Sequence, residues 1–263
     1  MRRKLQALGV LLLMGALKLP LEQRVTARLR AEKLIDEPVA AGKLEMMGQS
    51  GLAALLGGLR GLAASILQLR AHVEFTRVNW AQVDSLYRVI TLLQPRVDRY
   101  WDDASWHMAY NAAGHYHYRR DLPNALQGQL REQHVKRGID ILLEGLKVLP
   151  ESTRLWERLA EIYFRRSYEY KKAGDAYWQA WKLGAPSFTH HFAGFAYARA
   201  SDAESWQKAY DILKSEYDRG SITPGLIQHL KEVEQYLGIP REKRIPDATP
   251  MPKMPQNLPG PRR

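Results

Sequence analysis

The 263-residue chain contains no cysteine. It therefore has no disulfide, no thiolate metal ligand and no cysteine nucleophile. Runs of alternating apolar and polar residues, which are typical of half-buried strands, are also missing between residues 51 and 239. In place of such runs, apolar residues recur with a period near 3.6 over almost all of this region. The sequence therefore predicts an all-α chain.

Motifs of catalysis and metal binding are likewise absent from the sequence. It has no HExxH, no GxSxG and no phosphate-binding loop. His115 and His117 would point about 200° apart on a helix and His107 lies two turns earlier, so the three cannot share one ion. The carboxylates of Glu157 and Glu161 have arginines nearby, a pattern typical of ion pairs on a helix surface. We expect no enzyme activity, no metal, no cofactor and no small-molecule substrate.

Basic residues outnumber acidic ones and give a net charge of +11, but this charge is unevenly distributed. Residues 1–33 carry eight Lys or Arg against two Glu, and residues 240–263 carry six against two acidic residues. Only +1 remains for the 206 residues between them. A nucleic-acid-binding protein is expected to concentrate basic charge on its folded body. The pattern therefore favours attraction to an anionic lipid surface and argues against a nucleic-acid partner.

The N-terminal region resembles a short membrane anchor. Residues 5–17 form an uncharged run of 13 residues, shorter than the ~20 apolar residues of a full membrane span. We interpret residues 1–21 as an uncleaved anchor, with a cleaved signal peptide or a surface-lying helix as alternatives. Residues 22–50 form a basic linker. The glycine-rich stretch 50–69 is either the first buried helix of the body or a membrane-contacting segment.

The body, residues 51–239, contains an internal repeat. Prolines at positions 95, 123, 150, 186 and 224 punctuate the helical periodicity, as expected where helices end. In the clearest unit, residues 153–186, bulky and small side chains alternate on the facing sides of two helices. We expect these to pack together: Trp156, Leu159, Ala160 and Tyr163 of the first helix, and Ala173, Tyr177 and Ala180 of the second.

A shift of 36 residues finds a second copy, in which Phe192, Phe195, Ala196, Ala209 and Leu213 take the corresponding places. Weaker copies lie upstream, where an insertion of roughly twenty residues, including 119–129, separates the two helices of one unit. The stretch 223–237 has the features of a closing helix, with Thr223 as its N-terminal cap and proline in the first helical position.

This order of residues resembles the tetratricopeptide repeat: a large residue, Leu-Gly/Ala and Tyr, then Ala, an aromatic, Ala and a closing Pro. The resemblance implies about four helical hairpins and a closing helix that stack into a right-handed solenoid and bind other proteins. The segments 57–71, 92–95 and 106–111 are also similar to functionally uncharacterised, membrane-anchored bacterial repeat proteins. That similarity implies a location in the cell envelope and carries no activity with it.

These observations lead us to expect a membrane-tethered scaffold that binds proteins within a bacterial envelope complex, from the periplasmic side of the inner membrane. A purely structural subunit of such a complex is the main alternative, and a helical enzyme or glycan-binding domain is a further one. The tail, residues 240–263, holds seven of the 14 prolines and is expected to be extended. From the repeat phase, these residues are expected to line the concave face: Arg99, Asp102, Trp106, Arg154, Glu157, Glu161, Arg165, His190 and Tyr197.

Overall fold

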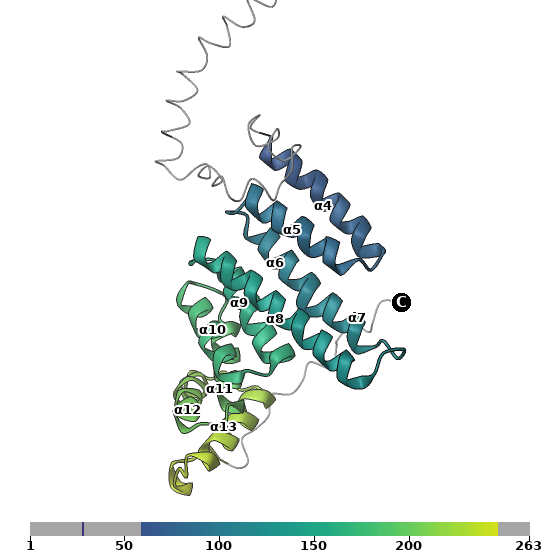
Figure 1. Ribbon diagram of the computed structural model, residues 1–263. Helices are drawn as coiled ribbons and strands as arrows, with labels where there is room; N and C mark the ends of the chain where they lie inside the picture. The colour runs from purple at the N-terminus through teal and green to yellow at the C-terminus, as the bar shows by residue number, and fades with distance from the viewer. Residues whose placement is uncertain (1–27, 29–58, 247–263) are drawn as a thin grey trace, which may run out of the picture.

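The computed structural model describes residue 28 and residues 59–246, which contain helices and turns but no strand (Figure 1). The predicted all-α class is confirmed for this part of the chain. Within it, no helix combines the length and the apolar character that crossing a lipid bilayer requires. The predicted anchor (1–21), the linker (22–50) apart from residue 28, residues 51–58 of the predicted body and residues 247–263 of the tail lie outside the described residues.

The helices follow one another with short connections. In chain order they are α4 (Arg60–Thr76), α5 (Trp80–Leu93), α6 (Asp98–Trp106), η2 (His107–Ala112), α7 (Ala113–His117), α8 (Asn124–Val148), α9 (Thr153–Ile162), η3 (Tyr163–Ser167), α10 (Tyr170–Lys182), α11 (Phe188–Arg199), α12 (Ala203–Asp218), α13 (Pro224–Tyr236) and the short 3-10 turn η4 (Arg241–Lys243).

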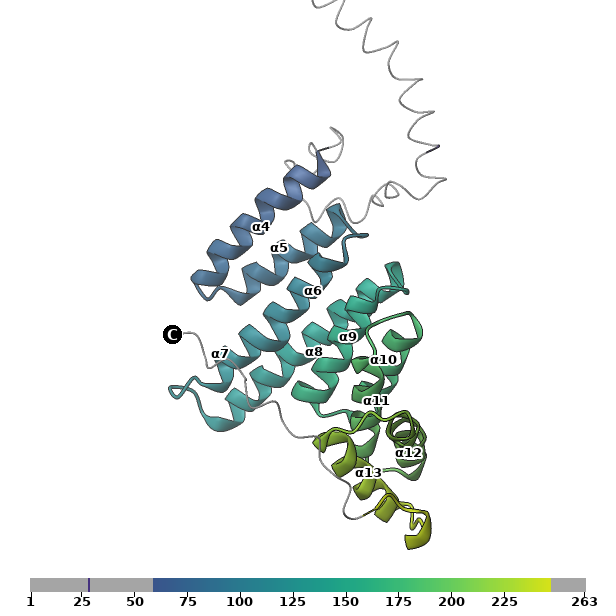
Figure 2. The ribbon, with the colours of Figure 1, turned by 180° about the vertical axis from the view of Figure 1, so that it is seen from behind.

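Consecutive helices lie side by side in a row that runs from α4 at one end to α13 at the other (Figures 1 and 2). They form successive pairs, whose first helices are α4, α6, α9 and α11 and whose second helices are α5, α8, α10 and α12. The segments η2 and α7 continue α6, and η3 continues α9. First helices also contact one another, since α6 packs on α9, and the first helix α11 packs on the closing helix α13.

Side-chain caps fix where several helices begin. The side chain of Ser152 accepts a hydrogen bond from the backbone N–H of Leu155, and the side chains of Asn79 and Asp202 cap α5 and α12 in the same way. Thr223 caps α13 and Pro224 occupies its first turn, as the sequence predicts. Such caps satisfy N–H groups that have no partner inside the helix and stabilise a helix by about 1 kcal/mol each.

A recurring tryptophan contact holds the start of three helices to the preceding turn. In each case the indole N–H donates to the backbone carbonyl six residues earlier in the chain, so both polar groups have a partner. The donor–acceptor distances are 2.9 Å for Trp101 and Pro95, 2.8 Å for Trp156 and Pro150, and 2.6 Å for Trp206 and Ala200.

Glycines allow the second helices to approach their neighbours closely. A Cβ on Gly174 would lie 2.5 Å from the ring of Tyr197, and one on Gly194 would lie 2.7 Å from Leu213. Gly145 meets the ring of Trp101 in the same manner, at 2.9 Å. These distances leave no room for a methyl group, so the pairing of glycine with a large residue sets the helix spacing.

Two first helices contain a π-helical segment, and the two segments contact each other. Arg166 of η3 donates hydrogen bonds to the backbone carbonyls of Ala109 (3.1 Å) and Tyr110 (3.2 Å) in η2. Its guanidinium group also lies 4.4 Å from the centroid of the Tyr110 ring. Backbone hydrogen bonds in a π-helix join residues five apart instead of four, which changes the partners of the carbonyl groups. In η2, an arginine from the next helix pair donates hydrogen bonds to two of these carbonyls.

The second copy of the repeat differs in phase from the sequence alignment. In second helices the shift of 36 residues holds, because Ala173 and Ala209 are both buried. In first helices the burial pattern repeats after 34 residues, so that Leu159 corresponds to Ala193. Phe192 does not occupy the place of Trp156: it is 40% exposed, whereas the half-buried Trp156 is held by its indole hydrogen bond.

The other residues assigned to the repeat core are buried or partly buried. The buried residues also include Ala160, Tyr163, Tyr177, Ala180, Ala196 and Leu213, while Phe195 is partly buried against the cluster around α13. The first part of the tail differs from the extended segment expected. Ile245 is buried there, and its backbone N–H donates to the buried carboxylate of Glu234 over 2.9 Å.

Candidate functional site

A groove of about 470 Å³ lies on the first-helix side of the row. Its walls come from α6, α9 with η3, and α11, and Tyr177 of α10 adds to its lining. We call it the first-helix groove. It is lined by Asp102, Thr153, Arg154, Glu157, Arg158, Glu161, Arg165, Tyr177, Phe188 and Phe192. The structure thus brings together five of the residues expected on the concave face: Asp102, Arg154, Glu157, Glu161 and Arg165.

An ion-pair network organises the charged wall of the groove. Arg158 donates to the buried carboxylate of Asp102 at 2.5 Å and to Glu161 at 2.6 Å. Arg154 lies 3.8 Å from the second oxygen of Asp102, and Arg165 lies 3.7 Å from Glu161. Because α6 supplies Asp102 and α9 supplies Arg158, the network ties two neighbouring first helices together and fixes the shape of this wall.

Glu157 stands apart from this network. Among the described residues, no side chain forms a hydrogen bond or an ion pair with its half-buried carboxylate. Burial raises the pKa of Glu157, and Arg154 and Arg158 oppose that rise. A carboxylate that is partly dehydrated and lacks a direct partner favours the approach of a cationic or N–H-bearing group.

The opposite wall of the groove is aromatic. Phe188 and Phe192 of α11 are 46% and 40% exposed, and their rings meet edge to face at 5.6 Å. The Phe192 ring also lies 5.6 Å from that of Tyr177, whose pKa is raised to about 12 by burial and by the nearby charge of Glu161. This wall offers an apolar surface beside a charged one, so the groove can contact both kinds of side chain.

Trp106 and Arg99 lie outside the lining of the groove. Trp106 is 37% exposed at the end of α6; the guanidinium of Arg158 lies 4.5 Å from its ring centroid, and Tyr110 stacks on it at 4.1 Å. Arg158 therefore connects Trp106 to the groove. Arg99 is exposed on α6, where it lies 3.5 Å from Asp103.

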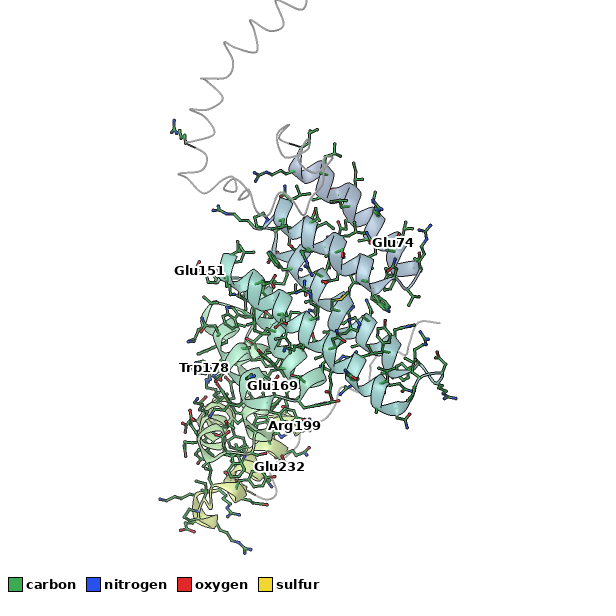
Figure 3. The ribbon with its side chains drawn as sticks, in the orientation of Figure 1. Glu74, Glu151, Glu169, Trp178, Arg199 and Glu232 are labelled. Atoms are coloured by element: carbon green, nitrogen blue, oxygen red, sulfur yellow. The ribbon has the colours of Figure 1, made fainter. Side chains whose placement is uncertain are left out.

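The structure does not place His190 and Tyr197 on this face. His190 is 5% exposed, hydrogen-bonds with Glu216 at 2.6 Å, and packs against the ring of Trp178, which Figure 3 labels on α10. Tyr197 is 2% exposed and donates its hydroxyl to Asp175 at 2.6 Å. The physical reason is the phase of the repeat, because a shift of two residues turns a side chain by about 200° around a helix.

The same shift explains which groove residues the sequence analysis missed. With the observed shift of 34 residues, Arg154 and Arg158 correspond to Phe188 and Phe192. The sequence does contain a feature that could have identified Phe188 and Phe192, because two phenylalanines four residues apart at the start of a helix lie on the same face. Thr153 and Arg158 were also not predicted, although each is adjacent to a predicted residue on the same helix, Thr153 to Arg154 and Arg158 to Glu157.

No metal-binding arrangement occurs in the described part of the chain, where no group of three or more His, Asp or Glu side chains could hold an ion. The ring of His107 lies between those of Phe75 (5.1 Å) and Tyr87 (5.3 Å). Burial lowers the pKa of His107. The ring of His107 thus belongs to an aromatic cluster formed by α4, α5 and η2.

Comparison with protein-family models gave no match for this chain, and neither did comparison with curated proteins.

Proposed function

We propose that this chain is a tetratricopeptide-type helical-repeat scaffold whose first-helix groove binds a segment of a partner protein. The observation that carries the proposal is the composition of the groove. Three successive first helices contribute to it, one wall holds charged groups in fixed positions, and the other exposes two phenylalanines. Peptide-binding surfaces combine such apolar contact areas with a few oriented polar groups.

The chemistry of the two walls defines the segment that fits. Phe188 and Phe192 suit an aliphatic or aromatic side chain, because their exposed rings lose water on contact. Glu157 suits a lysine, an arginine or a backbone N–H on the same segment, because its carboxylate forms no ion pair among the described residues. We therefore propose a partner segment that carries a basic residue close to an apolar one.

We further propose that residues 1–21 anchor the scaffold in a bacterial membrane and that the partner belongs to an envelope complex. The apolar run of residues 5–17 and the basic charge that flanks it support this location. An anchored scaffold gains affinity for a partner in the same membrane, because tethering raises the effective concentration of each for the other.

Affinity capture with matched variants tests the proposal. The tagged full chain is recovered from detergent-solubilised membranes in three forms: wild type, Glu157→Arg with Phe192→Ala, and Leu126→Ala. Leu126 is 38% exposed on α8 and does not line the groove. We expect a protein retained in stoichiometric amount by the wild type and the Leu126 variant and lost from the groove variant. Equal retention by all three forms would refute binding in the groove.

A further inference from the structure

One helix face at the end of the row is apolar and uncovered among the described residues. Helix α4 packs on α5 through one side, which includes the buried Ala64 and Ala71. Its other side, together with Leu59 at the N-cap position, exposes five large apolar residues, which we call the α4 stripe: Leu59 (52% exposed), Leu62 (58%), Ile66 (57%), Leu69 (71%) and Val73 (44%). Isolated apolar residues on a surface need no explanation, but a continuous row of them does.

The α4 stripe has the spacing of a coiled-coil seam. Its members follow one another at intervals of three and four residues in strict alternation, which is the spacing of heptad positions a and d. Position a holds Leu59, Ile66 and Val73, and position d holds Leu62 and Leu69. Branched residues such as Ile and Val at a, combined with Leu at d, favour a parallel pair of helices.

The residues beside the stripe are compatible with a second, identical helix. Ser65 and Arg70, which flank the stripe in its central part, are exposed, and neither is acidic. In a parallel pair, the position of Arg70 faces that of Ser65 in the other copy, so no like charges oppose each other. In the printed sequence the same spacing continues upstream through Leu55 and Leu52.

The position of α4 leaves room for such a partner. It is the outermost helix of the row in both views (Figures 1 and 2), and its contacts with the body lie on the α5 side. Glu74 lies near the C-terminal end of α4 (Figure 3), where its carboxylate forms an ion pair with Arg77 in the turn to α5. Among the described residues, none covers the stripe side of the helix, whose 17 residues offer a second copy about 25 Å of length.

We propose that the α4 stripe is a self-association surface, on which the α4 helix of a second copy of this chain packs in parallel and in register. A membrane surface is the competing occupant, but the stripe is a narrow seam and not the wide apolar face of a helix that lies on lipid. The proposal uses a different surface from the first-helix groove and stands independently of it.

The absence of cysteine makes the test direct, because a single introduced cysteine is the only thiol in the chain. Full-length Leu62→Cys and Leu69→Cys are each treated with a mild oxidant, with Tyr118→Cys as the control at a 79% exposed site that is not part of the α4 stripe. In a parallel pair, identical d positions face each other within disulfide range, about 4.4–6.8 Å between Cα atoms. We expect both stripe variants to form covalent dimers at least tenfold faster than the control.

Mixing the two stripe variants under different tags tests the orientation. Position 62 lies one heptad, about 10.5 Å, from position 69 along the axis, so few mixed 62–69 dimers should form. Predominantly mixed dimers would overturn the parallel arrangement, and dimer formation no faster than in the control would overturn self-association altogether.

Sedimentation of the cysteine-free chain completes the test. We expect a dimer for the wild type and a monomer for Leu62→Glu with Leu69→Glu, with the helical circular dichroism unchanged in both. A monomeric wild type that binds phosphatidylglycerol vesicles through the same two leucines would overturn the proposal in favour of a membrane-facing surface.

Discussion

At the scale of single residues, the charged wall of the groove depends on one buried carboxylate. Asp102 is 7% exposed and accepts from Arg158 at 2.5 Å, and Arg154 is a more distant second partner. Removing one partner of a buried ion pair costs more free energy than the intact pair contributes to stability. The reason is that the remaining charge keeps its desolvation penalty without the compensating attraction. The pair therefore holds α6 against α9 chiefly because either charge alone is penalised.

Replacing Arg158 by Met should lower the free energy of unfolding by about 2–3 kcal/mol, less than a fully buried pair would lose because Arg154 stays close to Asp102. Adding Asp102→Asn should recover most of that loss, because the carboxylate that needs a partner is then removed. Urea unfolding of the two variants and the wild type, followed by circular dichroism, measures both effects. A loss under about 0.5 kcal/mol in the single variant would mean that the pair behaves as an exposed one.

Glu157 should make stability depend on pH. Its pKa is raised above the ordinary 4.5, so the folded state favours the protonated carboxyl. The stability that protonation provides is present below about pH 4.5 and is lost as pH rises through the folded pKa. Glu157→Gln should thus be more stable than the wild type near pH 7, by about 0.5 kcal/mol or less because of solvent screening, and equal to it near pH 3.5.

Unfolding curves of both proteins at the two pH values check this expectation. A variant that is less stable than the wild type at neutral pH would mean that the Glu157 carboxylate has a stabilising contact in the folded chain.

At the scale of helices, the sequence predicts the elements better than the faces they present. Helix periodicity, prolines and caps locate the hairpins, and Thr223 caps α13 as expected. The pairing of small and large residues correctly identifies the buried face of second helices, as Ala180 and Leu213 show.

The phase of the first helix in the last pair could not be predicted in the same way. Phe192 and Phe195 both fit a 36-residue shift by residue size, whereas the structure buries Ala193 and Gly194. Small residues are buried there because Leu213 of α12 fills the space beside Gly194. That choice depends on a long-range contact. One helix therefore presents phenylalanines to the groove where the sequence alignment placed His190 and Tyr197.

Substituting alanine for glycine should have opposite effects at Gly174, where α10 packs closely on α11, and at Gly128 on α8, where the helix surface is open. In Gly174→Ala the new methyl group would meet the Tyr197 ring at 2.5 Å, which should destabilise the protein by about 1–3 kcal/mol. In Gly128→Ala nothing lies within 4 Å of the new methyl group, and the better helix propensity of alanine should stabilise the protein by about 0.5–1 kcal/mol. Thermal unfolding distinguishes them. Equal shifts in the same direction would contradict tight packing of these helices.

At the scale of the whole molecule, the row of hairpins has two different ends. At the C-terminal end, α13 covers Leu213, and Ile245 of the early tail packs against the same cluster. At the other end, α4 exposes an apolar stripe among the described residues. A stacked-repeat protein normally covers its terminal units with polar faces, so this difference supports a function for the α4 end in assembly.

We propose that a partner segment contacts the groove between these ends. Placing the photoreactive amino acid p-benzoylphenylalanine at position 192 of the full chain in living cells measures that contact directly, with position 126 as the matched exposed control. We predict a covalent adduct with one partner protein at position 192, its loss when Glu157→Arg is added, and no such adduct at position 126. The absence of an adduct at 192, or the same adduct at both positions, would contradict binding in the groove.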